Sequence, residues 1–430
     1  MMRRLMLLVL LAVPLMAQMS TPQPPPAAPG HAAVKTYTLP PDQLQKAIEY
    51  ARARNWLHFI EAAWGIAVIL AILAVKLAPR LRTWAEGITG VRFLQAYLFA
   101  PLLLLAVDAA GLPPEIYSHH LSRHYGESVQ GWGSWFWDWT KGELLEFLLA
   151  GLLVWLFYAA IRRSPRRWWF YFWLMAVPIV IFVLFIAPVV IEPLFFQYEP
   201  LAPKHPELVA SIEKVVARGG LAIPPERMFE MKASEKLRSL NADVEGLGAS
   251  KRVVVWDTTI EKMTTDEILF VFGHEMGHYV LGHNVLLIVE LCVVMLVFLF
   301  LGYHAARWML RRWGGRWSIR GMDDWASLPV MLLAVAVFSL IAEPVHNSFS
   351  RMIEHNADVY GLEVIHGLVP DSPQVAATAF QILGEIALSD PNPNAFVKFW
   401  LYDHPAVSDR VRFAAEYDPW RAGQEPKYVK

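Results

Sequence analysis

The stretch TTDEILFVFGHEMGH, from Thr264 to His278, predicts both a helix and a metal site. Thr264 and Glu267 form a capping-box pattern, and the apolar residues that follow predict a helix that begins at Thr264 and runs through the motif. His274 and His278 are four residues apart, so the helix places both imidazoles on one face, within reach of one metal ion.

The spacing also predicts a reaction at this metal. Neutral imidazoles bind Zn²⁺ and leave a coordination position open for water. Glu275, next to the first histidine, can take a proton from that water, so we expect it to be the general base. His283 follows His274 by nine residues, which is about 900° along a continuous helix. We therefore exclude His283 from the ligands.

The stretch RMIEHNAD, from Arg351 to Asp358, is expected to supply the third ligand. A catalytic zinc normally takes three protein ligands, and Glu354 is the best remaining candidate, with its neighbour His355 as the runner-up. Asp358 lies four residues after Glu354 on the same helical face, where a carboxylate can orient a zinc-bound imidazole through its second nitrogen.

The composition indicates a membrane protein. The chain has 430 residues, of which 55% are hydrophobic and 18% are charged, and its mean hydropathy is +0.34. Soluble domains have about 25% charged residues. Lys and Arg number 38 against 39 Asp and Glu, a balance that argues against a nucleic-acid partner. The single cysteine, Cys292, excludes an intramolecular disulfide and a cysteine-based zinc site.

Apolar segments long enough to cross a bilayer, which takes about 20 residues, lie near 56–77, 91–112, 144–161, 168–191, 285–303 and 328–345. We therefore predict a mostly α-helical, polytopic transmembrane bundle of about six spans. Two spans separate the less apolar segments 197–283 and 350–430, so both lie on the same side of the membrane and can form one soluble domain. Acids inside the apolar segments suggest a hydrated interior; these are Glu61, Asp108, Glu146 and Glu290.

The N-terminus and the loop charges predict an orientation. Residues 1–18 have two arginines, an apolar run and a small residue, a pattern typical of a signal peptide, with a short membrane anchor as the alternative. The Pro-rich residues after them form a linker. Arginines concentrate in alternate loops, which the positive-inside rule places in the cytoplasm. The metalloprotease domain would then be extracytoplasmic, and we expect a multi-pass protein of the bacterial inner membrane.

The expected domain organisation follows from these segments. The divisions are a signal peptide or anchor at 1–18, a linker and helix start at 19–50, a four-span N-terminal domain at 51–196, a metalloprotease segment at 197–283, two transmembrane helices at 284–349 and a second metalloprotease segment at 350–430.

Further motifs accompany HEMGH in a fixed order. They are YARAR at 50–54, APVVIEPLFFQYEPL at 187–201, Asn241-Ala242, KRVVVWD at 251–257, Glu354-x-x-x-Asp358, and Asp403-His404-Pro405 with Arg410. In these motifs the chain resembles the type I CAAX prenyl endopeptidases, which are integral-membrane zinc metalloproteases of the gluzincin group. The resemblance implies that the segments 197–283 and 350–430 form one zincin-type α+β metalloprotease domain. It also implies that His274, His278 and Glu354 bind one zinc ion and that Glu275 is the catalytic base.

The resemblance implies supporting roles as well. Asp358 matches the carboxylate beside a zinc ligand, Asn241 the residue that holds the substrate backbone, and His404 the residue that stabilises the oxyanion, with Arg410 as its support. The run Val253–Trp256 is typical of a strand, and an exposed edge there would align an extended peptide by β-augmentation.

These expectations combine into a membrane-embedded zinc metalloendopeptidase that cleaves membrane-associated or lipidated proteins or peptides. Eukaryotic relatives have a further N-terminal span and a cytosolic site, and no feature of this sequence identifies a prenyl-binding surface. A strict CAAX prenyl-protein endopeptidase is therefore the first alternative. The alternative from another class is a non-enzymatic scaffold or transporter with a structural zinc, against which Glu275 argues.

Overall fold

A bundle of long helices forms most of the molecule. The structure is a computed structural model that describes residues 33–246 and 251–430. Six of the helices in this part are long and apolar enough to span a membrane, as the hydropathy predicts. They are α2 (Pro41–Ala74), α4 (Arg92–His124), α5 (Trp132–Arg163), α6 (Trp168–Ile186) with its π-helical and 3₁₀ extension to Leu194, α10 (His283–Trp313) and α11 (Leu328–Ile365).

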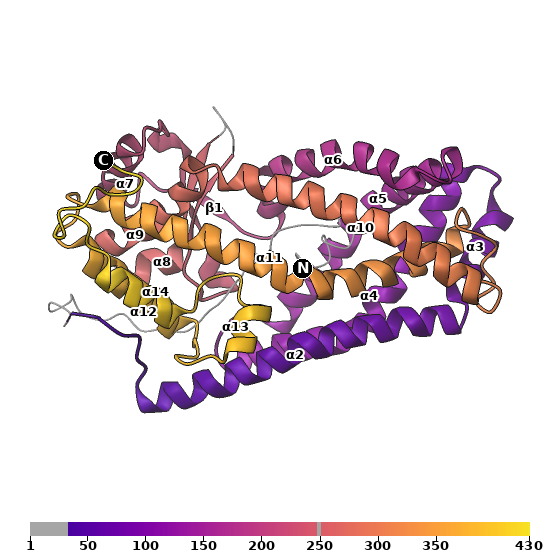
Figure 1. Cartoon of the computed structure of the whole chain (residues 1–430), viewed down its shortest axis with the longest axis horizontal. Helices are drawn as coiled ribbons and strands as arrows, with labels where there is room; N and C mark the ends of the chain where they lie inside the picture. Colours follow the sequence, from indigo (N-terminus) through magenta and orange to yellow (C-terminus); the bar gives the residue numbers. More distant parts are fainter. Residues whose placement is uncertain (1–32, 247–250) are drawn as a thin grey trace.

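The outer surface of the bundle is suited to lipid. Large apolar side chains lie exposed along the spans, which is unfavourable in water but expected where the surrounding solvent is hydrocarbon. Examples are Leu148 on α5, Phe182 on α6, Val285 and Val289 on α10, and Ile341 and Val345 on α11. The short helix α3 (Leu77–Ile88) closes one end of the bundle, on the right of Figure 1.

The opposite end carries a small α+β domain. Its strands are β1 (Tyr198–Pro200), β2 (Met228–Met231), β3 (Ala242–Glu245) and β4 (Arg252–Trp256), in the order β1-β2-β4-β3. β4 is parallel to β2 and antiparallel to β3. The helices of this domain are α7 (Pro206–Arg218), α8 (Asp257–Lys262), α9 (Thr265–Val280), α12 (Ser372–Ile386), α13 (Ala395–Leu401) and α14 (Val407–Glu416).

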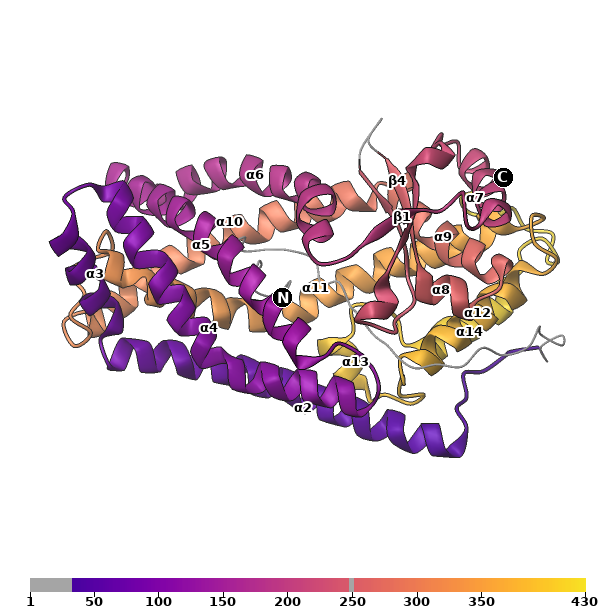
Figure 2. The ribbon, with the colours of Figure 1, turned by 180° about the vertical axis from the view of Figure 1, so that it is seen from behind.

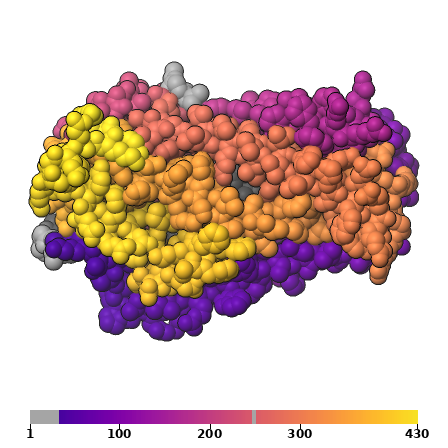
Figure 3. Space-filling model, viewed as in Figure 1, coloured from indigo at the N-terminus to yellow at the C-terminus, as the bar shows by residue number. Residues whose placement is uncertain are grey.

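The two less apolar segments share one hydrophobic core at this end. Strand residues such as Val253, helix α9 residues such as Phe272, and Phe380 of α12 are all buried in it. Figure 2 shows α12 and α14 together below α8 and α9, and α12 packs against both α9 and α14. In the space-filling view the C-terminal residues cover this end and border the N-terminal helix (Figure 3), where Phe396 of α13 stacks on Phe59 of α2 at 6.1 Å.

Helix α11 joins the bundle to the small domain. The apolar segment predicted near 328–345 is only its first half, because the helix continues without a break to Ile365. At 1.5 Å per residue its 38 residues extend about 57 Å. Near its end, Glu363 accepts hydrogen bonds from the backbone amides of Tyr428 and Val429, at 2.6 and 2.9 Å. The C-terminal half of this membrane helix therefore enters the small domain, where the C-terminal tail holds it.

The segment before α2 also contacts the small domain. The side chain of Tyr37 is buried, its hydroxyl donates to the carbonyl of Ser389 at 3.1 Å, and its ring fills the space where Gly384 has no side chain. This strap ties α2 to α12. The predicted signal peptide or anchor, residues 1–18, lies outside the described residues.

Candidate metal centre and active site

Helix α9 positions two histidines. The predicted capping box is confirmed, since the Thr264 hydroxyl accepts from the Glu267 amide and the Glu267 carboxylate accepts from the Thr264 amide. The helix runs through the motif to Val280. Nε2 of His274 and Nε2 of His278 lie 3.2 Å apart, so the two imidazoles point at one position.

Helix α11 brings a carboxylate to the same position. Glu354 Oε2 lies 3.1 Å from His274 Nε2 and 3.6 Å from His278 Nε2. Among the described residues, two groups of His, Cys, Asp or Glu could hold a metal, and this is one of them. His355, the runner-up ligand, is the wrong alternative, because it is exposed and packs on Phe413 instead.

Two glycines allow the helices to approach this closely. A Cβ on Gly361 of α11 would lie 3.0 Å from the backbone nitrogen of His274, and one on Gly273 of α9 would lie 2.8 Å from Val364. The backbones of α9 and α11 are therefore in near contact beside the first histidine. This contact brings the Glu354 side chain close to the two histidines.

The three donors fit a zinc ion. A tetrahedral Zn²⁺ with bonds of about 2.0–2.1 Å places its ligand atoms roughly 3.3 Å apart, and the distances here are 3.1 to 3.6 Å. Glu354 Oε2 is buried and has no hydrogen bond of acceptable geometry within the described residues, although imidazole nitrogens surround it. Two neutral imidazoles and one carboxylate also form a ligand set that zinc enzymes use. We call these three residues the metal centre.

A carboxylate and a guanidinium support the first histidine. His274 Nδ1 lies 2.8 Å from Asp358 Oδ1, and Arg410 donates to both oxygens of Asp358, at 3.0 and 2.5 Å. Burial lowers the pKa of His274, but the neighbouring carboxylates of Asp358 and Glu354 outweigh it and raise that pKa to about 9. Asp358 therefore holds the ring so that Nε2 faces the metal centre.

His404 also reaches the centre, and it has a partner that the sequence interpretation left without a role. His404 Nε2 lies 3.1 Å from Glu354 Oε2, while Nδ1 lies 2.9 Å from Asp403 Oδ1. Its side chain is 42% exposed and so remains accessible to a ligand. Burial opposes a charge on His404, but the carboxylates of Glu354 and Asp403 raise its pKa well above the usual value. The position of Asp403 directly before His404 was the sequence feature that could have identified it as the partner of this histidine.

Glu275 is half-buried on α9, beside the first histidine. Burial raises the pKa of this carboxyl to about 8, with the negative charge of Asp243 adding to the effect and His274 opposing it. A carboxyl with such a pKa can exchange a proton near neutral pH, as a general base requires.

The exclusion of His283 rested on a wrong premise. Helix α9 ends at Val280, and Gly282 adopts a φ of +70°, so the chain turns before His283 begins α10. His283 is buried, and its Nδ1 lies 3.3 Å from Nδ1 of His278. The residue is no member of the metal centre, but it is in contact with a ligand instead of facing away.

The position of the exposed strand edge was also wrong. The run Val253–Trp256 does form a strand, but β4 is an inner strand between β2 and β3. The edge is β3, and Asn241 immediately precedes it, with its side-chain amide donating to Asp243 at 3.2 Å. Sheet order depends on contacts between distant segments, which a strand's own sequence does not encode. Asn241 thus lies at the start of the edge strand that packs against α9.

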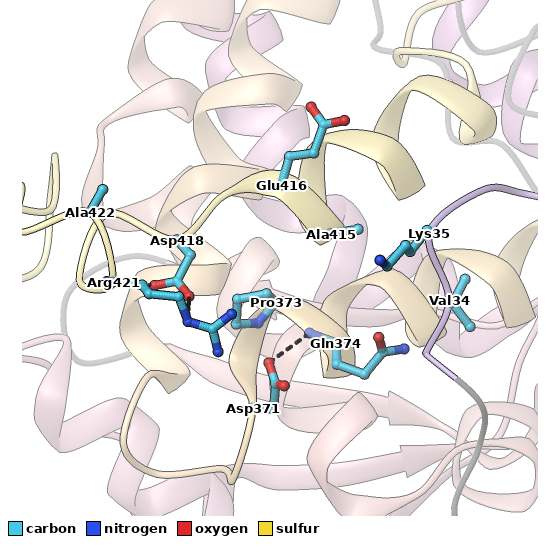
Figure 4. A pocket seen from close by; sticks show the side chains of 10 residues that line it. All are labelled: Val34, Lys35, Asp371, Pro373, Gln374, Ala415, Glu416, Asp418, Arg421 and Ala422. Atoms are coloured by element: carbon cyan, nitrogen blue, oxygen red, sulfur yellow. Dashed lines mark hydrogen bonds and ion pairs between the residues drawn. The ribbon is translucent and has the colours of Figure 1, made fainter.

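Two other features lie apart from the metal centre. Asp108, Glu143 and Glu146 form the second group of possible ligands, between α4 and α5 in the bundle; we call it the bundle triad. A surface pocket of about 440 Å³ lies near the N-terminal strap and includes Val34, Asp371 and Arg421. Figure 4 shows that its side chains come from the strap, α12 and the C-terminal residues, and it contains none of the residues expected in the site.

Comparisons with known proteins agree with this arrangement. Residues 20–197 match the model of the CAAX prenyl protease N-terminal domain with five membrane helices, and residues 203–418 match peptidase family M48. The chain is 33% identical to the uncharacterized metalloprotease YhfN of Bacillus subtilis, over 91% of this chain and 89% of that protein. It is 25% identical to CAAX prenyl protease 1 of Saccharomyces cerevisiae, over 86% and 85% of the two chains.

The fold has a counterpart among solved structures. The crystal structure of Ste24p from S. mikatae superposes with a TM-score of 0.74, at 23% identity, over 89% of this chain and 92% of that one. The family match replaces the alternative of a non-enzymatic scaffold or transporter. Four of the candidate spans in the described residues lie within the region that matches the N-terminal family model. The chain therefore belongs to peptidase family M48 and is a multi-pass membrane metalloendopeptidase with the N-terminal domain of the CAAX prenyl proteases.

Proposed function

We propose that this metalloendopeptidase uses one zinc ion, held by His274, His278 and Glu354, to hydrolyse peptide bonds of membrane-associated proteins. The observation that carries the proposal is the convergence of two Nε2 atoms and one carboxylate oxygen within 3.1 to 3.6 Å, with Glu275 next to His274 on α9. Zinc in this donor set supplies a Lewis acid for the peptide carbonyl and for the attacking water.

Glu275 moves the proton. Its carboxylate removes a proton from the attacking water and later delivers it to the leaving amine, so that the same group acts first as base and then as acid. The charges of Asp243 and His274, which shift its pKa in opposite directions, tune it for both steps.

His404 stabilises the charge that develops on the carbonyl oxygen. Asp403 holds its Nδ1 and favours the protonated ring, so Nε2–H, which lies 3.1 Å from Glu354 Oε2, is a donor at the metal centre. Arg410 acts elsewhere than the resemblance implied, because it binds both oxygens of Asp358 and so supports the His274 ring. Asn241 and strand β3 lie where an extended substrate can add to the sheet edge, with the Asn241 side chain available to its backbone.

The membrane setting limits the substrates. The metal centre lies where α11 leaves the bundle, so a substrate reaches it from the membrane side or from the adjoining aqueous phase. We propose that membrane proteins or lipidated peptides are cleaved. Strict specificity for a prenylated C-terminus is the alternative, and the names of relatives such as the S. cerevisiae CAAX prenyl protease 1 support it. Cleavage of one peptide with and without a farnesyl group separates the two.

The decisive experiment compares the detergent-purified wild type with Glu275→Gln. We expect both to contain about one zinc per chain by elemental analysis, and only the wild type to cleave an unfolded reporter protein. Glu261→Gln is the matched control, because this exposed glutamate pairs only with neighbouring Lys262 and its loss should change nothing. Undiminished proteolysis by Glu275→Gln would contradict the mechanism.

The orientation is proposed from the arginine-rich loops, with the metal centre on the extracytoplasmic face of a bacterial inner membrane. Ala422 and Gly315 are both exposed. Ala422 follows α14 of the small domain, whereas Gly315 follows α10 in the segment that contacts α3. In a Cys292→Ser background, a membrane-impermeant maleimide added to intact spheroplasts should label Ala422→Cys and not Gly315→Cys. The reverse pattern would place the site in the cytosol.

A further inference from the structure

Cations gather at the end of the bundle remote from the metal centre. Three segments meet there, at 75–92, 161–168 and 304–325, and they contain thirteen Lys or Arg and three acids. Two of these acids are already paired, Asp324 with the buried Arg82 at 2.5 Å and Glu86 with Arg320 at 2.9 Å. Most of the positive charge at this end is therefore exposed and has no acidic partner among the described residues.

Four exposed arginines lie at adjoining ends of two packed helices. Arg166 and Arg167 directly precede α6, and Arg307 and Arg311 lie in the last turns of α10. We call them the α6–α10 arginine cluster. None of the four has an ion pair with an acid in the part of the chain that the structure describes.

Ring contacts show that the two pairs share one side of the bundle. Trp169 of α6 packs on Phe300 of α10, with ring centroids 5.1 Å apart, and helical spacing continues this stripe from Phe300 through His304 to Arg307 and Arg311. Arg307 is fixed on this side, because it donates to the hydroxyl of Tyr303 at 3.2 Å. The arginines of α10 therefore extend toward the start of α6.

The cluster lies at the depth of lipid headgroups. Helix α10 has 31 residues and is about 46 Å long, whereas the hydrocarbon core of a bilayer is about 30 Å thick. The helix is therefore longer than the core, and its final turns, which carry Arg307, Arg311 and Arg312, are the charged end suited to the headgroup layer. Trp308, 55% exposed beside Arg307, is the residue type that occupies the membrane–water interface.

We propose that the α6–α10 arginine cluster is a binding site for the phosphate groups of an anionic phospholipid. A guanidinium donates two hydrogen bonds to phosphate oxygens, and four of them beside exposed apolar rings match a negative headgroup with acyl chains. A lipid with two phosphates, such as cardiolipin, fits four cations better than one with a single phosphate. The bound lipid would hold α6 against α10.

The test uses the full chain in detergent micelles, with cardiolipin, phosphatidylglycerol or phosphatidylcholine added in turn. We expect native mass spectrometry to show retained cardiolipin, and the melting temperature to rise with cardiolipin more than with phosphatidylcholine. Replacing all four arginines by glutamine should weaken cardiolipin retention at least tenfold, since each cation near an anionic headgroup contributes about a fivefold factor.

A matched control variant removes cations at the other end. Arg412, Arg421 and Lys430 are exposed cations of the small domain, and their replacement by glutamine should leave cardiolipin retention unchanged. Equal loss in this control would show charge-driven binding without a site and would overturn the proposal, as would full retention by the four-arginine variant. Because all four arginines are exposed, the variant is expected to fold, and zinc content verifies it.

His283 carries a second inference, which rests on the proposed metal centre. Its Nδ1 lies 3.3 Å from Nδ1 of His278, with ring centroids 5.1 Å apart. His278 can ligate a metal through Nε2 only if its proton is on Nδ1. We infer that Nδ1 of His283 accepts this proton in a hydrogen bond, so that His283 is a positioning residue for the second ligand.

Metal affinity tests this role without relying on activity. We expect His283→Leu to weaken zinc binding about 10–100-fold in a chelator competition and to change the visible spectrum of the Co²⁺-loaded protein. His283→Gln should restore much of the affinity, because its amide oxygen can accept the same hydrogen bond. His304→Leu, another histidine of α10 but exposed and stacked on Phe300, is the control that should bind zinc normally.

The outcomes separate this inference from the proposed function. If the wild type itself fails to bind stoichiometric zinc, the metal centre is wrong. If the wild type binds zinc and His283→Leu binds it equally well, only the positioning role is wrong. Equal weakening in folded His283→Leu and His283→Gln would also contradict a hydrogen-bond acceptor.

Discussion

The metal centre and the bundle triad both bring three possible ligand atoms within 4.8 Å of one another, yet their surroundings differ. The metal centre combines two imidazoles with one carboxylate, and Asp358 and Arg410 support it from behind. The bundle triad consists of carboxyl groups alone, and each of its acids has an interaction partner in the bundle. Proximity of possible ligand atoms is therefore a weak criterion for a metal site. The two groups are distinguished by the types of their ligands and by the residues that support those ligands.

The largest effect is expected from removing the carboxylate ligand of the metal centre. Glu354→Ala leaves two imidazoles, which cannot hold zinc against a chelator as three protein ligands do. We expect zinc content to fall from about one to well below one per chain, with complete loss of proteolysis. A variant that kept its full zinc content would show that Glu354 is not a ligand.

A smaller effect on zinc binding is expected when the ligand His274 is kept and its supporting residue Asp358 is changed. Asp358→Asn removes the negative charge that holds Nδ1 of His274 and pairs with Arg410. We expect zinc affinity to fall about 10–100-fold, as for other groups behind metal ligands. Competition with a chelator measures it, and an unchanged affinity would make Asp358 a purely structural partner of Arg410.

The close approach of α9 and α11 gives a third test. Gly361→Ala places a Cβ 3.0 Å from the backbone of His274, where neither helix can yield without a shift. Overpacking of this kind costs about 1–3 kcal/mol of folding free energy. We expect a lower thermal unfolding temperature together with weaker zinc binding. Gly302→Ala on α10, with no atom within 4 Å, should leave both quantities unchanged.

The smallest effect is expected in the bundle triad. Glu143→Gln combined with Glu146→Gln removes two of its three carboxylates while keeping their shape. If the protein binds one zinc, at the metal centre, zinc content and affinity should stay at the wild-type values. A drop in stoichiometry from two to one would show instead that the bundle triad also holds a metal.

Local sequence patterns were sufficient to predict the main helices of this protein. The capping box at Thr264 and the four-residue spacing of the histidines predicted α9 and its two converging imidazoles, because both depend on contacts within one helix. The spans were predicted for the same reason, since the hydropathy of a segment determines whether it enters a bilayer. Helix α2 begins at Pro41, within the range 19–50 predicted for its start. The apolar pattern near 328–345 did not predict that α11 continues unbroken to Ile365, because this part of the helix is less apolar.

Such local patterns did not predict which distant segments of the chain come into contact. Glu354 was chosen as the best remaining third ligand without any evidence of contact, and His404 was found only through resemblance to a family. The turn at Gly282 reversed the expected position of His283. The inner position of β4 likewise depends on which strands pair with it. Helix periodicity and hydropathy thus determine which residues form helices and which can bind metal, because they are properties of short segments. Which of these residues meet was decided by packing, above all by the near contact of α9 and α11 at Gly361, since side chains hundreds of ångströms apart along an extended chain meet only when the core closes.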